Sequence, residues 1–312
     1  MKNILELRQT LESYGKKRTA EVDSLVKNYS EMTETERSFI TGLLMQYRPK
    51  NVLELGVSSG SGSIVILNGI KDIEGTTLHS VDLLERWYLD QNKSSGWLVE
   101  TLVPELTYLW NLHLGLDAVE VMDTIVNTNG KVDFVVLDTA HIHPVETLNF
   151  LCVLPYLENG AVVVLHDISL HITNAGYSSN SYACRLLFDS VTANKLTPKE
   201  KYTSFPNIGA FQVSEDTKKY IYGMFSSLML PWSVLHARPW QSLVPTGLLS
   251  HYAECFEKFY GESYKEMFLD SVKAQNDLFK NVPFLSFVKM LLKHFVYGII
   301  QTTKNKIIFP KT

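Results

Sequence analysis

The sequence predicts an α/β fold with a doubly wound, mostly parallel sheet, and three observations support this prediction. The apolar runs 51–55, 132–137 and 161–165 have the composition of buried strands. A glycine-rich turn joins the first of these runs to an apolar helix. Helical patterns separate the later strands, and strands that alternate with helices build a parallel sheet covered on both faces.

Length and composition limit what the chain can be. Its 312 residues can hold one α/β domain and a smaller accessory region. A net charge of -4 and a pI near 6.1 give no basic footprint for nucleic acid. The three cysteines lack metal-ligand spacing and the N-terminus lacks a signal-peptide core, which predicts a cytoplasmic protein with reduced thiols. No apolar run reaches transmembrane length without charge.

Three regions are expected along the chain. Residues 1–48 form an N-terminal helical segment, in which Thr33 and Glu36 have the spacing of a capping box. The sheet domain spans 49–214 and closes with a late, antiparallel strand at 208–213. The rest, 215–312, is a helical C-terminal region that serves as a cap or makes substrate or oligomer contacts.

The glycine-rich turn after the first strand is the most informative segment. Gly56, Gly60 and Gly62 permit left-handed dihedral angles and let a ligand approach the backbone closely. The helix that follows, from Ser61 to Asn68, points unpaired N–H groups at whatever lies over the turn. The segment therefore predicts a site for a nucleotide-like ligand.

Three interpretations of this turn compete. Residues 56–60 fit the G-x-S-x-G elbow of serine hydrolases, but that elbow needs preceding strands, and residues 1–48 look helical. Residues 56–62 fit G-x-x-x-G-x-G, which some nicotinamide-dependent reductases use, but no Tyr-x-x-x-Lys follows. The third interpretation gives weight to Glu54, because a carboxylate just before the first glycine suits a cationic ligand and would repel a pyrophosphate.

A strand that ends in E-x-G-x-x-x-G resembles motif I of the class I S-adenosylmethionine (SAM) methyltransferases. In that family the acid lies near the cationic methionine end of the cofactor, and the glycines admit its ribose and carboxypropyl parts. The resemblance implies S-adenosyl-L-methionine as cofactor and a Rossmann-like sheet of seven strands. It also implies a set of cofactor-binding residues around the turn, namely Glu54, Gly56, Ser58, Gly60, Ser61 and Ser63.

Two further acids extend this predicted cofactor site. Asp82 ends the run 77–82, about twenty residues beyond the glycines, where an acid is well placed to bind ribose hydroxyls. Asp117 follows the run 112–114, and the resemblance gives this position a contact with the adenine. The alternative for Asp117 is an N-cap for the helix that begins at Ala118.

A second block, 132–167, contains a strand, D-x-x-H, a helix and a strand that ends in His-Asp. This order resembles the small-molecule O-methyltransferase branch that includes macrolide-sugar and catechol O-methyltransferases. In that branch acids at these two strand ends lie beside the transferred methyl group, and some members use them to hold a divalent cation. The resemblance implies that Asp138 and Asp167 are catalytic, that Asp138 also lies near the cofactor, and that both are candidate ligands of Mg²⁺ or another divalent cation.

Two routes for removing a proton from the acceptor stay open. A metal held by the two acids is one, although Ile168 stands where metal-dependent members carry a further ligand. A histidine base, His141 or His166, is the other, because imidazole titrates near neutral pH. His166 on a central strand also fits a purely structural role, whereas His141 belongs to a loop at the strand ends.

Three later segments have open roles. The polar stretch 169–180 follows Asp167 directly and fits either a lid or an ordinary surface loop. The stretch 231–240 is rich in Trp, His and Arg and is a candidate wall of a substrate pocket. The apolar helix at 284–300 has a cationic face that fits peripheral membrane contact, or docking on the body or on a second copy in a homo-oligomer.

The predicted site residues share one location, which is independent of any resemblance. Each lies at or just past the carboxyl end of a predicted strand, where open parallel sheets bind their ligands. Together with the two resemblances, this location predicts a SAM-dependent methyltransferase that methylates a hydroxyl on a small molecule or saccharide and does not bind nucleic acid. The alternatives are a nicotinamide-dependent reductase and a non-catalytic SAM-fold module that binds a partner.

Overall fold

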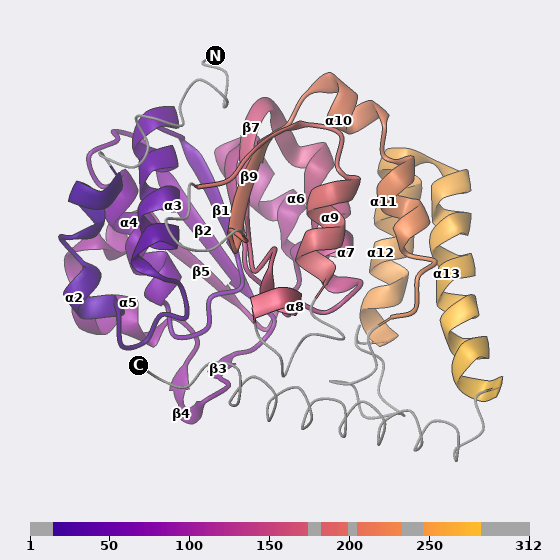
Figure 1. The fold of residues 1–312 in the computed structure, drawn as a ribbon, viewed down its shortest axis with the longest axis horizontal. Helices are drawn as coiled ribbons and strands as arrows, with labels where there is room; N and C mark the ends of the chain where they lie inside the picture. Colours follow the sequence, from indigo (N-terminus) through magenta and orange to yellow (C-terminus); the bar gives the residue numbers. More distant parts are fainter. Residues whose placement is uncertain (1–14, 174–181, 199–204, 233–245, 282–312) are drawn as a thin grey trace, which may run out of the picture.

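A seven-stranded sheet forms the centre of the protein (Figure 1). The computed structural model describes residues 15–173, 182–198, 205–232 and 246–281. The strand order is β5-β2-β1-β6-β7-β9-β8; β9 is antiparallel to both of its neighbours, and the other neighbouring pairs are parallel. The predicted Rossmann-like, mostly parallel fold is thus confirmed. The strands are β1 (Asn51–Leu55), β2 (Thr77–Asp82), β5 (Trp110–Leu114), β6 (Val132–Leu137), β7 (Leu157–His166), β8 (Asn194–Leu196) and β9 (Ile208–Gln212).

Helices cover both faces of the sheet, so each central strand is buried on both sides and is apolar almost throughout. One core packs beneath α3 (Glu34–Tyr47) and α4 (Ser61–Ile70), and the other lies between the sheet and α6 (Ala118–Asn129), α7 (Val145–Val153) and α9 (Ala183–Ser190). Alternate residues of β6 enter alternate cores, as Phe134 and Val135 illustrate. The shorter helices are α2 (Asp23–Val26), α5 (Trp97–Leu102), α8 (Leu170–Thr173), α10 (Glu215–Lys219), α11 (Tyr222–Ser227) and two 3₁₀ helices, Pro104–Leu109 and Leu154–Tyr156.

The predicted capping box at the start of α3 is present. Thr33 Oγ1 accepts from the N–H of Glu36, and the N–H of Thr33 donates to the Glu36 carboxylate. The helix ends at Tyr47, before Pro49. Glu36 is buried, with 4% of its surface exposed, so the capping acid points inward and not to solvent.

The C-terminal region packs beyond α7, at the opposite end of the molecule from α2 and α5 (Figure 1). The end of this predicted helical region is described as two helices, α12 (Thr246–Tyr260) and α13 (Glu262–Asn281), which meet at Gly261. The φ of Gly261 is +89°, a value that glycine adopts without strain. Three segments with predicted roles lie outside the described residues. They are most of the candidate lid (174–180), most of the Trp-rich pocket wall (233–240) and the cationic helix (284–300). Within the described ranges, no helix is long and apolar enough to cross a membrane.

A two-stranded hairpin, β3 (Arg86–Trp87) and β4 (Asp90–Ser94), follows β2 and was not predicted. It projects from the body of the molecule (Figure 1) and carries two exposed apolar side chains, Tyr88 and Leu89. Tyr88 Oη donates to Glu31 Oε1 at 2.8 Å, which ties the hairpin to the loop before α3. Both of these segments border the cavity described next.

Candidate active site

A cavity of about 850 Å³ opens at the carboxyl ends of β1, β2, β6 and β7. This volume lies in the range of small-molecule and cofactor sites. Its described lining contains no lysine or arginine. It contains two histidines, His141 and His166, and six acids: Glu31, Glu54, Asp82, Asp117, Asp138 and Asp167. The acids that the sequence placed on separate strand ends therefore meet around one cavity.

The glycines of the turn serve different purposes. Gly56 has a φ of +90°, and a Cβ there would lie 1.9 Å from the carbonyl oxygen of Asp138, so only glycine lets the two strand ends approach. Gly60 has a φ of +95°, and its Cβ would meet the backbone of Gly96 at 2.9 Å. Gly62 lines the cavity, where its Cβ would lie 3.0 Å from Glu54 Oε1.

Asp82 fixes the turn against the end of β2. Its Oδ2 accepts from the N–H groups of Val57 at 2.9 Å and Ser58 at 3.0 Å, and its Oδ1 accepts from Leu84 N–H at 2.8 Å. The carboxylate thus bridges two loops through three neutral donors. Two of these donors occupy Oδ2 and one occupies Oδ1, so Oδ1 keeps a lone pair for a further donor, such as a hydroxyl of a bound ligand.

Glu54 is a buried acid with neutral partners. It accepts hydrogen bonds from the hydroxyl groups of Ser63, at 2.6 Å, and Ser80. Burial raises the pKa of Glu54 to about 8; the two serines oppose the rise, and repulsion from Asp138 and Asp82 adds to it. A cation placed over Glu54 would restore its charged form.

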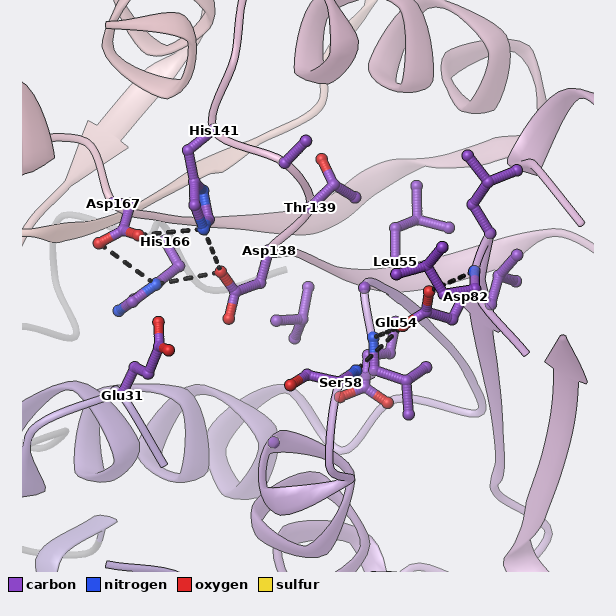
Figure 2. A pocket seen from close by; sticks show the side chains of 18 of the residues that line it. Glu31, Glu54, Leu55, Ser58, Asp82, Asp138, Thr139, His141, His166 and Asp167 are labelled. Carbon is purple, nitrogen blue, oxygen red and sulfur yellow. Dashed lines mark hydrogen bonds and ion pairs between the residues drawn. The ribbon is translucent and has the colours of Figure 1, made fainter. Parts of the chain in front are cut away.

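Two histidines and two aspartates form a compact group at the other end of the cavity (Figure 2). His141 Nε2 lies 3.1 Å from Asp167 Oδ2 and 3.5 Å from Asp138 Oδ1. His166 Nδ1 lies 3.1 Å from Asp138 Oδ1 and 3.5 Å from Asp167 Oδ1. Asn207 Nδ2 donates to Asp167 Oδ1 at 2.6 Å and holds that carboxylate from β9's side of the sheet.

His166 is buried among carboxylates and is held as a cation. Its Nε2 lies 3.7 Å from Glu36 Oε1, an ion pair longer than a hydrogen bond. Burial lowers the pKa of an imidazole, but Asp138, Glu36 and Asp167 outweigh this effect and raise the pKa of His166 well above its usual value. Burial would likewise raise the pKa of Asp138 and of Glu36, yet His166 holds both below their usual values.

His141 is supported from behind by the start of α7 and by α9. Its backbone N–H donates to Glu146 Oε1, which also accepts from Thr139 Oγ1 at 3.1 Å. Its Nδ1 lies 3.7 Å from Cys184 Sγ. Burial raises the pKa of the Cys184 thiol well above its usual value, so this partner is uncharged. The ring therefore has a neutral neighbour behind it and two carboxylates in front.

Backbone strain concentrates around the cavity. Within the described part of the chain, four residues other than glycine have positive φ, and three of them line the cavity: Ser58 at +52°, His141 at +57° and Asp167 at +57°. Such conformations cost free energy and persist at functional sites where the surroundings enforce them. Two of these strained residues, His141 and Asp167, also belong to the charged group of histidines and aspartates described above.

Residues 53–168 match the family model described as a methyltransferase domain. They supply most of β1, the whole of β2, β5, β6 and β7, and the loops between them. The strand order and the antiparallel β9 agree with this match. Residues 53–168 therefore form a methyltransferase domain. The fold and the methyltransferase class predicted from the sequence are thereby confirmed.

Solved structures similar to this methyltransferase include the O-methyltransferase TomG from Streptomyces achromogenes, involved in tomaymycin synthesis and determined with SAM. It is 16% identical, with 69% of this chain and 100% of that chain covered and a TM-score of 0.45. The Bacillus cereus O-methyltransferase in complex with SAH is 16% identical, with coverages of 64% and 90% and a TM-score of 0.43. MycE from the mycinamycin biosynthetic pathway, determined with Mg, SAH and mycinamycin VI, is 15% identical, with coverages of 66% and 56% and a TM-score of 0.42. A search of curated proteins gives no match.

The methyltransferase domain brings most of the predicted site residues to the cavity. Those in its lining are Glu54, Gly56, Ser58, Ser61, Asp82, Asp117, Asp138, His141, His166 and Asp167. Two predicted cofactor contacts do not line it. Gly60 packs on Gly96, and Ser63 is fully buried and donates to Glu54, so both act one layer behind the cavity. Asp117 caps α6 in a capping box with Glu120, as the alternative predicted, and it also borders the cavity; its contact with the adenine stays a prediction.

Several residues around the methyltransferase site gave no recognisable signal in the sequence. Glu36 fits the capping box with Thr33, so the sequence already gives this acid a structural role and does not indicate its ion pair with His166. Asn207 lies in the approach to β9, forty residues after its partner Asp167. Glu146 lies in the first turn of α7, where acids are common, so nothing in the sequence marks its burial.

Proposed function

We propose that this methyltransferase transfers the methyl group of SAM to a hydroxyl oxygen of a small molecule or saccharide. The observation that supports this best is a single cavity with two differently built ends. One end offers carboxylates held by neutral donors, which suit a cationic cofactor. The other end places an imidazole between two carboxylates, which suits removal of a proton.

The glycine turn fits the cofactor. SAM supplies an electrophilic methyl group on a sulfonium cation, and the chain's part is to bind and align it. Glu54 would face the cationic methionine end. Asp82 would accept from a ribose hydroxyl with the lone pair of Oδ1 that its three backbone donors leave open. Leu83, Leu116 and Asp117 line the cavity beyond Asp82 and would enclose the adenine.

His141 is the proposed general base. Its Nε2 lies within 3.5 Å of both Asp138 Oδ1 and Asp167 Oδ2, so a proton gained there would be stabilised by two carboxylates. His166 cannot take this role, because it already holds its proton between Glu36 and Asp138. We assign His166 the role of keeping Asp138 ionised and oriented.

The same group of side chains fits a divalent cation. Asp138, His141 and Asp167 each offer one ligand atom, and these atoms all lie within 4.8 Å of one another. Carboxylate and imidazole donors suit Mg²⁺ or Mn²⁺ with water completing the shell, and the metal would supply Lewis acidity toward the acceptor oxygen. EDTA treatment followed by addition of Mg²⁺ tests this arrangement: unchanged turnover leaves the metal out of the reaction.

The cavity also limits the charge of the acceptor. With six acids and no lysine or arginine in its described lining, it would repel phosphate and carboxylate groups. Its entrance is apolar, because Tyr29, Leu84, Tyr88 and Leu89 border it with large exposed surfaces. We therefore propose a neutral or cationic acceptor with an apolar body. The three free cysteines fit a reducing compartment, and we propose a cytosolic reaction.

The two alternative functions lack such support. A nicotinamide cofactor would bring its pyrophosphate against Glu54 and Asp82 without any cation to neutralise it. A non-catalytic module would need no group of His141, Asp138 and Asp167 at the cavity, with strained backbone at His141 and Asp167. Both observations favour catalysis with a cationic methyl donor.

Calorimetric titration of the full chain with SAM, SAH and NADPH tests the proposal. We expect SAM and SAH to bind at micromolar concentrations and NADPH not to bind. Asp82→Ala should weaken SAM binding at least about tenfold, since it removes the acceptor for the ribose and loosens the turn. The matched control is Glu100→Gln, an acid on the exposed face of α5. Binding of NADPH in place of SAM, or an equal loss in both variants, would refute the assignment.

A further inference from the structure

Side chains of the C-terminal helix α12 form hydrogen bonds and ion pairs with the first two turns of α6. Tyr252 Oη donates to Asp117 Oδ1 at 2.8 Å, and His251 Nδ1 lies 3.8 Å from Glu120 Oε1. Asp117 and Glu120 are the two members of the α6 capping box. Further along, Lys258 Nζ contacts both oxygens of Asp123 at 3.0 Å. The region that no sequence motif explained is therefore fastened to the start of the helix that borders the cavity.

Tyr252 is the buried centre of this contact. It is only 2% exposed, and its Oη also accepts from Asn149 Nδ2 at 3.2 Å. The same amide nitrogen lies 3.4 Å from Asp117 Oδ2. Asp117, Asn149 and Tyr252 thus form a closed triangle of side chains. Two of its members line the cavity, whereas none of the described residues after Leu170 does so.

We propose that Tyr252 is a positioning residue for the cofactor. By holding Asp117 and Asn149 in the arrangement that forms the adenine end of the cavity, it makes SAM affinity depend on the C-terminal helices. This inference rests on the proposed function, because it assumes that SAM occupies the cavity. It assigns residues 246–260 a role in cofactor binding although they contact no part of the cavity themselves.

The hydroxyl of Tyr252 serves binding more than folding. Without it, Asp117 keeps the hydrogen bond from Val119 N–H and therefore still caps α6. What is lost is the donor that fixes the carboxylate laterally and the acceptor that fixes the amide of Asn149. The two side chains can then pair with each other or with water in other orientations, and the shape of the cavity wall is no longer unique.

A matched pair of variants separates positioning from general stability. Tyr252→Phe removes this hydroxyl, and Tyr260→Phe removes a hydroxyl of the same helix that donates to the Leu151 carbonyl oxygen at 2.6 Å, away from the cavity. SAM affinity is measured by calorimetry, and thermal unfolding is measured for both variants of the full chain. We expect Tyr252→Phe to weaken SAM about tenfold and Tyr260→Phe to change it less than twofold, with similar losses in melting temperature.

Each result decides the matter. If the unmodified chain fails to bind SAM, the proposed function is wrong. If it binds SAM and Tyr252→Phe binds equally well, or if affinity falls only in proportion to melting temperature in both variants, the positioning role is wrong. A measurement on the unmodified chain adds an independent check, because coupling is reciprocal: SAM should slow hydrogen exchange in 248–256 and not in 265–275 of α13. Equal protection of both segments, or of neither, would also overturn the inference.

Discussion

Both ends of the cavity place acidic side chains close together, but the partners that stabilise these acids differ between the two ends. At the glycine turn, Glu54 and Asp82 are held by serine hydroxyls and backbone N–H groups, all of them neutral. At the far end, Asp138 and Asp167 share the internal cation His166. The first end therefore leaves Asp82 without a counter-ion and Glu54 ready to ionise beside a cationic ligand. The second end is already partly neutralised and is suited to moving a proton. The difference shows that the partners of an acid, more than the acid itself, decide its function.

The largest test of this comparison removes the imidazole at the far end. His141→Gln should lower turnover about 10²–10⁴-fold while SAM affinity stays within about twofold, because the general base is lost and the cofactor end is untouched. Single-turnover formation of SAH with an accepted hydroxyl compound and calorimetry with SAM measure the two quantities. A variant that binds SAM poorly but turns over normally when saturated would reverse the assignment of the two ends.

The next largest expected effect is on the pH dependence of stability, and it comes from His143, in the same loop as His141. His143 is fully buried and stacks on Tyr182, and burial lowers the pKa of His143 to about 4. The unfolded state thus binds this proton first, so the stabilisation is complete above pH 6.5 and falls by about 3 kcal/mol as the pH drops toward 4. His143→Phe should flatten this acid limb in denaturant titrations at a series of pH values. An unchanged slope would show that His143 is protonated in the folded chain.

At the glycine turn, two alanine substitutions distinguish structure from ligand contact. Gly60→Ala should destabilise the fold by about 1–3 kcal/mol, because its φ is positive and its Cβ meets the backbone of Gly96. Gly62→Ala should leave melting nearly unchanged and weaken SAM several-fold, since its Cβ would press on Glu54 at the cavity wall. Thermal unfolding and calorimetry on both variants test this; the opposite pattern would place the ligand over Gly60.

The smallest expected effect is a proton count. Because the pKa of Glu54 is about 8 in the ligand-free chain, binding of a cation should lower it and release up to one proton near pH 7.5. Calorimetry in buffers with different ionisation enthalpies measures this release. SAM, with its sulfonium, should release more protons than SAH, and Glu54→Gln should abolish the difference. A difference between SAM and SAH that persists in the variant would exclude Glu54 as its source.

Sequence patterns predicted this fold well where the composition of a segment reflects its burial in the folded protein. Buried parallel strands are apolar throughout, so 132–137 and 161–165 were recognisable, and the acids that follow them had to lie at one sheet edge. The hairpin at 86–94 was missed because its strand Asp90–Ser94 is polar and partly exposed, without apolar alternation. Glu36 and Tyr252 were missed because each also satisfies an ordinary structural pattern, a cap and a core aromatic. Their contacts with His166 and Asp117 span more than a hundred residues of chain.

These two residues bear on how the protein can be dissected. Glu36 precedes and Tyr252 follows the segment 53–168 that the family model matches. A fragment cut to the sheet domain, 49–214, would retain every motif residue. It would still lose Glu36, one of the three carboxylates around His166, and Tyr252, the hydrogen-bond donor to Asp117. Expression boundaries drawn from motif content alone would therefore yield a fragment that contains all the motifs. Its active site would nevertheless lack a supporting side chain at each end.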